Sequence, residues 1–252
     1  MLFHIFYAAE ATQQPTNAAR EIYFRVVKNQ SKSAPYRERP NHRDPADLCE
    51  AKRLEKIMIK LENGMAQSVP AMDPSFRSHL RLIKPSDAEF VCRLRGNPCL
   101  NKHLSPSVAD VEAQRQWIER YKNREAAGSE LYFVIVSDHA DRGVVRLYDI
   151  KEIDGKPSFC WGSWIIEPPS TPGLATFSAI MIYEIGFDAL GFTRSHFDVR
   201  KGNDKVLGFH ARAGAEEVGD DEDNIYFSYS REAYATFRAA SDRQVREHRI
   251  KI

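Results

Sequence analysis

From Ser78 onward, the sequence alternates between short runs rich in β-branched and aromatic residues and longer runs with apolar residues at helical spacing. This alternation is typical of a mixed α/β domain. Before Ser78 the sequence is rich in Gln, Asn, Pro and charges of both signs, and it lacks such alternation. We therefore predict an N-terminal extension over residues 1–77 that is partly helical or weakly ordered, a domain over residues 78–240, and a basic C-terminal tail over residues 241–252.

The predicted extension has one strong helical pattern, at residues 45–63, whose apolar side chains fall near one face. Two interpretations are open. In the first, the extension is weakly ordered or is even sequence upstream of a true start at Met65 or Met72, and in the second it is an arm that binds a partner or a second copy of the chain. A homodimer is therefore an open alternative.

The order of the segments predicts an α/β (α+β) fold. Strands are predicted at residues 80–83, 131–136, 144–150, 159–166, 195–199, 216–218 and 225–229, and helices beginning at Pro85, beginning near Ser107, over 177–190 and ending at Gly214. The three consecutive strands after the second helix are separated by turn signals, so they predict an antiparallel meander. We expect a mixed, mostly antiparallel central sheet flanked by helices.

The charges nearly balance, since 36 Lys and Arg against 35 Asp and Glu give a net charge of +1. This balance gives no basic surface for nucleic acid or an anionic membrane. The apolar start, Met1–Ala9, is too short to span a membrane and lacks the features of a secretory signal. The cysteines form no CxxC pair and have no histidine at zinc-ligand spacing, so we predict neither a metal site nor disulfides. We expect a cytoplasmic protein.

A loop rich in Pro and Gly, at residues 167–176, leads from the third meander strand into the most apolar helix. Amide groups at a helix N-terminus are unpaired and carry partial positive charge, which favours a phosphate group. The small residues of the loop also leave its backbone open to close approach. We predict that the loop binds the phosphates of a cofactor through Pro172, Gly173, Leu174, Ala175 and Thr176.

This loop resembles the pyrophosphate-binding loop of the GNAT superfamily of acetyltransferases, which is written Q/R-x-x-G-x-G/A. Residues 170–175 match both small positions and depart at Ser170, where the family usually has Arg or Gln. A second resemblance lies downstream, where a strand is followed by Asn203, a short helix, and Gly214 eleven residues later. The resemblance implies a GNAT-type fold and acetyl-CoA as the acyl donor.

The resemblance also implies roles for individual residues. The backbone of Ile165, Ile166 and Glu167, at the end of the third meander strand, would polarise the thioester carbonyl. Asn203 would help to hold the cofactor, and Phe209 would pack against the cofactor or the core. These positions complete the cofactor-binding set that we predict.

His210 lies four residues before Gly214, at a position where the superfamily often has a tyrosine that protonates the departing CoA thiolate. An imidazole titrates near neutrality, so this side chain could act as the general acid or make a hydrogen bond beside the thiol. We predict His210 as the catalytic residue, with Tyr226 and Tyr229 as the alternative proton donors.

Segments near the start of the domain resemble the acceptor-side helices of GNAT enzymes from bacterial nucleotide-aminosugar pathways. Similar segments occur in relatives that acetylate ribosomal protein N-termini. The residues that carry this resemblance, and that we predict to bind the acceptor, are Arg93, Arg95, Asn97, Asn101 and Trp117. No spacing identifies a general base among Glu130, Asp149, Glu167, Glu184, His103 and His196. Water could take the proton of an aminosugar, whose amine is less basic than that of lysine.

The resemblance thus implies direct transfer of an acetyl group from acetyl-CoA to a primary amine of a small molecule, with a nucleotide-linked amino sugar as the favoured acceptor. Two alternatives stay open. One is a protein N-terminal or lysine acetyltransferase with the same fold. The other is a non-catalytic module with this fold that binds acyl-CoA or a partner.

Overall fold

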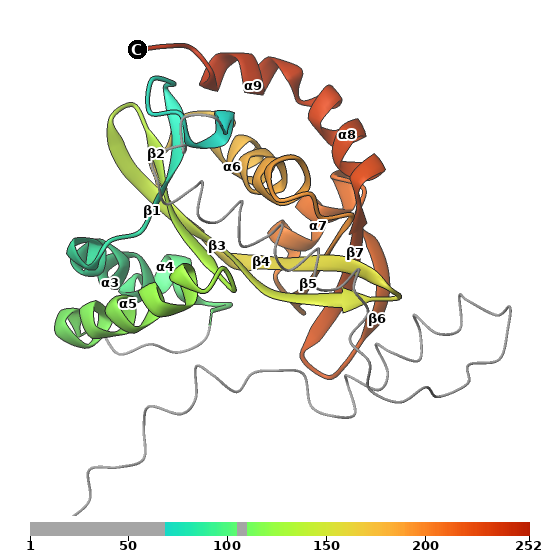
Figure 1. Cartoon of the computed structure of the whole chain (residues 1–252), viewed down its shortest axis with the longest axis horizontal. Helices are drawn as coiled ribbons and strands as arrows, with labels where there is room; N and C mark the ends of the chain where they lie inside the picture. The colour runs from blue at the N-terminus through green and yellow to red at the C-terminus, as the bar shows by residue number, and fades with distance from the viewer. Residues whose placement is uncertain (1–68, 105–109) are drawn as a thin grey trace, which may run out of the picture.

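The computed structural model of the chain describes residues 69–104 and 110–252, so most of the predicted extension lies outside the described residues. Its centre is one seven-stranded sheet in the order β1-β2-β3-β4-β5-β7-β6 (Figure 1). The strands are β1 (Ser78–Leu82), β2 (Leu131–Ser137), β3 (Ala140–Ile153), β4 (Lys156–Ile166), β5 (Arg194–Arg200), β6 (Glu216–Asp220) and β7 (Asn224–Ser230). Neighbouring strands are antiparallel except β4 and β5, which are parallel.

Helices cover both faces of this sheet (Figure 1). One face carries η3 (Pro85–Asp87), α3 (Ala88–Gly96), α4 (Pro98–Asn101) and α5 (Val111–Ala126). The other face carries α6 (Leu174–Tyr183), which continues as the π-helical turn η4 (Glu184–Ala189), together with α7 (Asp204–Arg212), α8 (Arg231–Ala240) and α9 (Asp242–His248). A short 3-10 turn, η2 (Pro70–Met72), precedes β1.

Strand β2 shows how the sheet separates two cores. Its side chains are buried along the whole strand, and they alternate between the two faces with the period of two that a strand imposes. Phe133 and Ile135 join the larger core beneath α6, whereas Tyr132 and Val134 join the smaller core beneath α3 and α5. The strand therefore reads as continuously apolar because both of its faces are covered.

The mixed, mostly antiparallel sheet with flanking helices is confirmed. The three meander strands are β2, β3 and β4, and the predicted hairpin is β6 with β7. The apolar helix begins at Leu174, earlier than expected, because Gly173 is its N-cap. The predicted helix start near Ser107 lies outside the described residues, and α5 is capped by Asp110, whose carboxylate accepts from the N–H groups of Glu112 and Ala113.

The structure differs from the predictions at the C-terminal end of the domain. Residues expected to form a basic tail include helix α9, which packs on α6 and buries Val245 and His248. Charged residues fill most of this short helix and conceal its apolar side, so no helical pattern stands out in the sequence. The last residues belong to the domain and are not a tail.

The N-terminal boundary also differs from the prediction. Val69, Ala71 and Met72 are buried in the larger core, although they were assigned to the extension. The N–H of Ile252 donates to the Ser75 carbonyl at 3.0 Å, so the two ends of the described domain are joined by hydrogen bonds. The described core therefore begins at least nine residues before Ser78, because it includes Val69.

Two truncations test this boundary. A protein that lacks residues 1–75 loses the buried side chains of Val69 and Met72, which one that lacks residues 1–68 retains. Full burial of such a side chain contributes about 1.5–3 kcal/mol, so we expect the shorter protein to be less stable by about 3 kcal/mol or more. Urea unfolding followed by circular dichroism measures the difference. Equal midpoints for the two proteins would show that residues 69–75 add nothing to the core.

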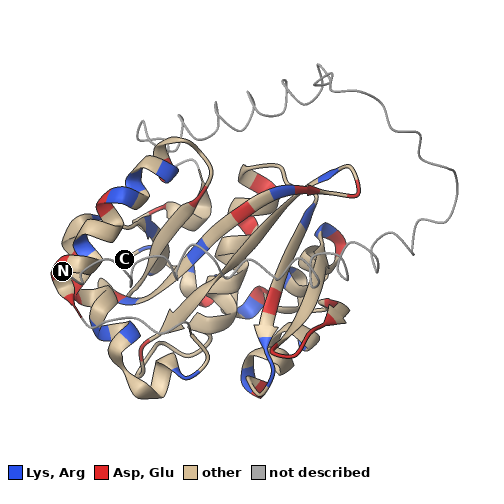
Figure 2. Cartoon of the chain, turned by 90° about the horizontal axis from the view of Figure 1, so that it is seen from below, with Lys and Arg blue, Asp and Glu red and all other residues tan. Residues whose placement is uncertain are grey.

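Charged residues of both signs are interspersed over the helices and loops (Figure 2). Within residues 69–104 and 110–252, no helix combines the length and the apolar character that crossing a bilayer requires. In the same part of the chain, no three His, Cys, Asp or Glu side chains come together as a metal site. The described surface therefore directs attention to the sheet and its loops.

Candidate active site

Strands β4 and β5 pair only briefly. They share two register positions, Ser158 with Arg194 and Phe159 with Ser195. Beyond these positions each strand stays bonded to its other neighbour, β3 or β7. The facing edges of β4 and β5 then have no partner strand within the described sheet, so their N–H and C=O groups are available to a ligand. We call this place the fork.

A bulge shapes the end of β4 beside the fork. The register shift between β3 and β4 leaves Ser163 and Trp164 out of the paired positions, and Ser163 has a φ of 49°. The N–H of Glu167 donates to the Arg142 carbonyl on the β3 side. Backbone groups of successive strand residues point to opposite edges. The N–H groups of Glu167 and Ile165 therefore face β3, and that of Ile166, which lies between them, faces the fork. Of the three residues predicted to polarise a carbonyl, Ile166 is the one whose N–H can do so.

Gly173 lies within the predicted phosphate loop and is the N-cap of α6. Its φ of 82° lies in the left-handed region, where a side chain is unfavourable. As N-cap it offers no side-chain hydrogen bond, so the first turn of α6 has no side-chain acceptor from its cap. Pro172 and Ala175 are exposed at this turn. The N–H of Leu174 already donates to the Thr171 carbonyl at 3.0 Å, so the amides of this turn that fit the pyrophosphate of acetyl-CoA are those that follow it, at Ala175 and Thr176.

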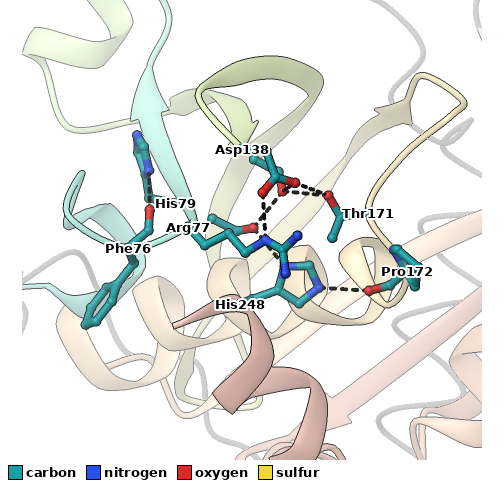
Figure 3. Close-up of polar contacts among 9 residues, drawn as sticks. Phe76, Arg77, His79, Asp138, Thr171, Pro172 and His248 are labelled. Atoms are coloured by element: carbon teal, nitrogen blue, oxygen red, sulfur yellow. Dashed lines mark hydrogen bonds and ion pairs between the residues drawn. The ribbon is translucent and has the colours of Figure 1, made fainter. Parts of the chain in front are cut away.

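Polar side chains from the sheet hold this loop from one side (Figure 3). Thr171 Oγ1 donates to Asp138 Oδ2 at 2.7 Å, and Arg77 Nε donates to the other oxygen of Asp138 at 2.7 Å. Ser137 Oγ lies 3.0 Å from Thr171 Oγ1 and 2.9 Å from Ser78 Oγ. These contacts join the loop to β1 and to the turn between β2 and β3.

Helix α9 holds the same loop through His248 (Figure 3). Its Nε2 donates to the Pro172 carbonyl at 3.1 Å, and its Nδ1 lies 2.7 Å from Ser78 Oγ. The ring stacks on Phe177 of α6, with the ring centroids 4.8 Å apart. A Cβ atom on Gly173 would lie 3.1 Å from the Gln244 side chain, so α9 packs directly against the turn. No motif or spacing in the sequence predicts this contact.

The structure places His210 beside the fork, within a group of aromatic rings. It is 4% exposed, and its ring lies 4.2 Å from that of Phe197 on β5 and 5.4 Å from that of Trp161 on β4. Burial lowers the pKa of His210 to about 3, so the ring is neutral near pH 7. Its Nδ1 and the Nε1 of Trp161 are buried without a hydrogen-bond partner in the described structure. Two such nitrogen atoms fit a polar chain that enters the fork.

The other residues implied by the downstream resemblance lie on α7. Asn203 is its N-cap, and its backbone carbonyl accepts from the N–H groups of Val206 and Leu207. The Phe209 ring lies 5.1 Å from that of Trp164 and packs against the larger core. The structure thus places both residues on the helix that carries His210.

The two alternative donors already use their hydroxyl hydrogens. Tyr229 Oη donates to the Ala213 carbonyl at 2.9 Å, and Tyr226 Oη donates to Asp221. Burial raises the pKa of both hydroxyls, and Asp221 raises that of Tyr226 further. Each of these hydroxyl hydrogens is therefore already donated within the described part of the chain.

On the sheet face opposite α6, three side chains form a row where the fork begins. Ser158 Oγ lies 2.7 Å from His196 Nδ1, and His196 Nε2 lies 3.2 Å from Asp149 Oδ2. Burial lowers the pKa of His196, so its neutral ring donates to the carboxylate and accepts from the hydroxyl. Ser158 is fully buried and Asp149 is exposed, so the carboxylate is the end of the row that a ligand can reach.

A second carboxylate, Asp198, lies on β5 two residues beyond His196. Its side chain is exposed, yet the protein around it removes enough water to raise the pKa of its carboxyl. The pKa of Asp149 is lowered, chiefly by the hydrogen bond from His196 and also by Lys151. Two carboxyl groups whose pKa values move in opposite directions can take different roles, and the one with the raised pKa binds a proton more readily.

Hydrogen bonds occupy the polar residues predicted on the acceptor side. Asn97 accepts from a backbone N–H in α4, and Asn101 donates to the Arg95 carbonyl at 2.9 Å, so the two amides fix the turn between α3 and α4. Arg93 forms an ion pair with Glu167 and so joins α3 to the end of β4. Of these residues, Arg93 is the one whose contact reaches the strand that borders the fork.

Trp117 lies in the smaller core on α5. It stacks on Tyr121 with a centroid separation of 5.9 Å, and it meets Tyr132 of β2 edge to face. The guanidinium groups of Arg124 and Arg146 lie over its ring at 5.3 and 5.5 Å. These contacts make Trp117 part of an aromatic and cationic stack beside the sheet.

Ion pairs also involve most of the carboxylates that the sequence analysis names as candidate general bases. Glu130 is buried and paired with Arg124 and Arg146, and Glu184 is paired with Arg249. Of the six open candidates, Asp149 and His196 are the two that share a contact at the fork.

Comparison with known proteins agrees with this geometry. Residues 77–216, more than half of the chain, match the family described as the acetyltransferase (GNAT) domain. A structure described as apo FdhC, a nucleotide-linked sugar GNAT, is 43% identical and covers 68% of this chain and 97% of its own, with a TM-score of 0.62. RimJ from Mycobacterium smegmatis, in complex with CoA-disulfide, is 19% identical and covers 66% of this chain and 90% of its own, with a TM-score of 0.55.

Spermidine N-acetyltransferase from Vibrio cholerae, in complex with CoA and spermine, is 19% identical. It covers 63% of this chain and 98% of its own, with a TM-score of 0.53. A comparison with curated proteins found no match. The family match over more than half of the chain, together with the 43% identical structure, shows that this chain belongs to the GNAT acetyltransferase family.

Proposed function

We propose that this protein transfers the acetyl group of acetyl-CoA to a primary amine of a small molecule, and that the acceptor is a nucleotide-linked amino sugar. The observation that carries the proposal is the 43% identity to a structure described as a nucleotide-linked sugar GNAT, over 97% of that chain. A cytoplasmic location, expected from the reduced cysteines, belongs to the same proposal.

The alternative acceptor is a protein N-terminus or a lysine. Two similar structures, RimJ and the ribosomal-protein-S5-alanine acetyltransferase from Vibrio fischeri, are each 19% identical to this chain. At that level the likeness concerns the fold and gives no support for a shared acceptor. A protein acceptor is therefore the second candidate, and a non-catalytic module that binds acyl-CoA is the third.

The cofactor side of the reaction uses the loop and the fork. Acetyl-CoA, when bound, supplies the thioester carbonyl that the amine attacks. The uncapped amides after Gly173 bind its phosphates, and the N–H of Ile166 points to the edge where a carbonyl oxygen needs a donor. Trp161 Nε1 and His210 Nδ1, which have no partner in the described structure, are the side-chain nitrogens that would meet its polar chain.

The acceptor side of the reaction uses the opposite face of the sheet. As the carbon–nitrogen bond forms and the carbon–sulfur bond breaks, the amine loses a proton, and we assign its uptake to the exposed carboxylate of Asp198, two residues beyond His196 on β5. Asp149, held by His196 and paired with Lys151, presents a carboxylate to which the ammonium form of the acceptor can bind. Cys160 lies nearby on β4, but burial raises the pKa of its thiol, so direct transfer is favoured over a cysteine carrier.

An acceptor screen tests the proposal. The purified full chain is mixed with acetyl-CoA and single amines, and release of the free thiol is followed. The panel contains nucleotide-linked amino sugars, the same sugars without the nucleotide, spermidine, and peptides with free N-termini. We expect turnover with at least one nucleotide-linked amino sugar and a lower kcat/KM for the matching free sugar. Preference for a peptide would establish the second candidate, and binding of acetyl-CoA without turnover on any amine would support the third.

His210 has a role in the same proposal. Its ring is neutral, so it would stabilise the leaving thiolate by donating an N–H hydrogen bond. A hydrogen bond to a charged group contributes about 1.5–3 kcal/mol, so we expect His210→Phe to slow turnover about 10- to 100-fold with unchanged affinity for acetyl-CoA. Steady-state rates at saturating substrates and calorimetric binding provide the two readouts. Turnover within about threefold of the unchanged protein would remove His210 from the mechanism.

The same variant should change how stability depends on pH. The pKa of His210 is about 3 when folded and 6.5 in its reference state, so the unfolded chain binds more protons between these values. The stability of the unchanged protein therefore falls as pH drops below 6.5, by about 2 kcal/mol at pH 5 from this group. His210→Phe should lack this loss, and urea unfolding at pH 7 and pH 5 measures it.

A further inference from the structure

Five hydrogen-bond contacts run in a row from the Pro172 carbonyl to Asp138 (Figure 3). The first two contacts are made by His248, whose Nε2 lies 3.1 Å from Pro172 O and whose Nδ1 lies 2.7 Å from Ser78 Oγ. Ser137 Oγ then lies 2.9 Å from Ser78 Oγ and 3.0 Å from Thr171 Oγ1. The last contact joins Thr171 Oγ1 to Asp138 Oδ2 at 2.7 Å. Both end groups, a carbonyl and an ionised carboxylate, can only accept. Each contact between them therefore needs a hydrogen of its own.

The number of hydrogens depends on the charge of His248. The three hydroxyl groups supply one each, and a neutral imidazole supplies one more, which makes four for five contacts. An imidazolium supplies two and completes the row. When the ring is neutral, two oxygen or nitrogen atoms in the row face each other without a hydrogen between them. When it is charged, every contact is a hydrogen bond.

Several groups around His248 oppose or favour that charge. Burial lowers the pKa of His248, and Arg77 lowers it further, whereas the Pro172 carbonyl, Asp138 and Glu247 raise it. Phe177 covers one face of the ring. The neighbouring cation, Arg249 at the C-cap of α9, is paired with Glu184. Without a ligand, the lowered pKa favours the neutral ring and the incomplete row.

We propose that His248 positions the pyrophosphate loop and that binding of the acetyl-CoA phosphates adds the second proton to its ring. This inference rests on the proposed use of acetyl-CoA. Negative charge at the loop favours the imidazolium, because Nε2 of the ring donates to the residue that precedes the N-cap of α6. The added proton completes the row, so the ligand and the loop stabilise each other. By linkage, acetyl-CoA binds more tightly as pH falls toward the pKa of the ring in the complex.

Calorimetry can count this proton. Acetyl-CoA is titrated into the full chain between pH 6.5 and 8, in buffers with different ionisation enthalpies. His248→Gln retains an N–H for the Pro172 carbonyl but cannot gain a proton. His79→Gln is the matched control, because this histidine follows Ser78 on β1 but contacts the Phe76 carbonyl instead of the loop (Figure 3). The 3′-phosphate of the ligand titrates in the same range, and comparison between variants with the same ligand removes its contribution.

We expect the unchanged protein and His79→Gln to take up protons on binding, and His248→Gln to lose this uptake. A rise of one unit in the pKa of the ring corresponds to an affinity gain of up to about tenfold at low pH, which His248→Gln should also lose. Ser78→Ala is a second variant. This variant lacks the two contacts that Ser78 makes, so three contacts remain in the row. Ser137, Thr171 and a neutral His248 ring supply three hydrogens for them. The ring then needs no second proton, and proton uptake on binding should disappear.

Equal proton uptake by the unchanged protein and His248→Gln would overturn the inference. Histidine ring signals in a nuclear magnetic resonance titration give an independent measure of the pKa of His248 with and without CoA. A pKa that stays the same in both states would also reject the inference. Absence of any acetyl-CoA binding to the folded unchanged protein would instead reject the proposed function, so the two failures are distinguishable. Melting temperatures show whether each variant is folded.

Discussion

Gly173→Glu is expected to abolish acetyl-CoA binding. The residue has a φ of 82°, and any Cβ atom there would lie 3.1 Å from the side chain of Gln244 and 3.5 Å from His248 Nε2. The new carboxylate would also place negative charge where the helix amides bind phosphate. Like charges brought together at a binding site cost several kcal/mol, so affinity should fall by more than about 100-fold. Isothermal titration calorimetry on the folded variant measures this loss.

Two control variants separate the causes of that loss. Gly173→Ala has the same backbone strain and the same contact with α9, without the charge, so it should bind acetyl-CoA more weakly than the unchanged protein but better than Gly173→Glu. Gly155→Glu introduces a carboxylate at a φ of 70° in the turn between β3 and β4, away from the loop. It should retain affinity. Unchanged affinity in a folded Gly173→Glu variant would reject the loop as the phosphate site.

Asp198→Asn is expected to lower turnover about 10²- to 10⁴-fold, the usual contribution of a general base, while affinity for acetyl-CoA stays unchanged. Because the pKa of Asp198 is raised, the unchanged enzyme should lose turnover as pH falls through that pKa and the carboxylate becomes protonated. The asparagine variant should lack this acid limb. Rates of thiol release across pH, at saturating concentrations of both substrates, measure both effects.

A matched pair of variants controls for the change of charge. Asp149 and Asp154 both have a positive φ, 48° and 53°, which asparagine tolerates well. Asp149→Asn should raise KM for the amine, because it removes the charge that attracts the ammonium group. Asp154→Asn should change neither constant, since its carboxylate pairs with Arg194 at the turn between β3 and β4. Turnover of Asp198→Asn within about threefold of the unchanged enzyme would leave water as the proton acceptor.

The sheet could be predicted from the sequence because its central strands are continuous apolar runs between turn signals. β2 is the clearest example, since every residue from Leu131 to Ser137 is buried, and its short length and its β-branched and aromatic residues favour a strand over a helix. The loop before α6 could be located because small residues precede an apolar helix, and its use as a phosphate site remains a prediction that rests on Gly173.

The partners of each functional side chain could not be predicted in this way. His196 and Asp149 are 47 residues apart, and their contact depends on a bulge in β3 and on the single parallel pairing of β4 with β5. The spacing that identified His210 says nothing about the aromatic rings from other elements that bury it. Those rings determine its pKa, and hence whether it can act as an acid or as a neutral hydrogen-bond donor.

The closure of the domain by its last helix has a consequence for synthesis. His248 lies 170 residues after Ser78, and the chain that follows it pairs with residues 75–77. Contacts of such long sequence separation form late in folding. On the ribosome, where the N-terminal part of a chain emerges first, the cofactor loop lacks its α9 partner until the final segment is released. During translation, the nascent domain therefore carries an incomplete form of the proposed acetyl-CoA site.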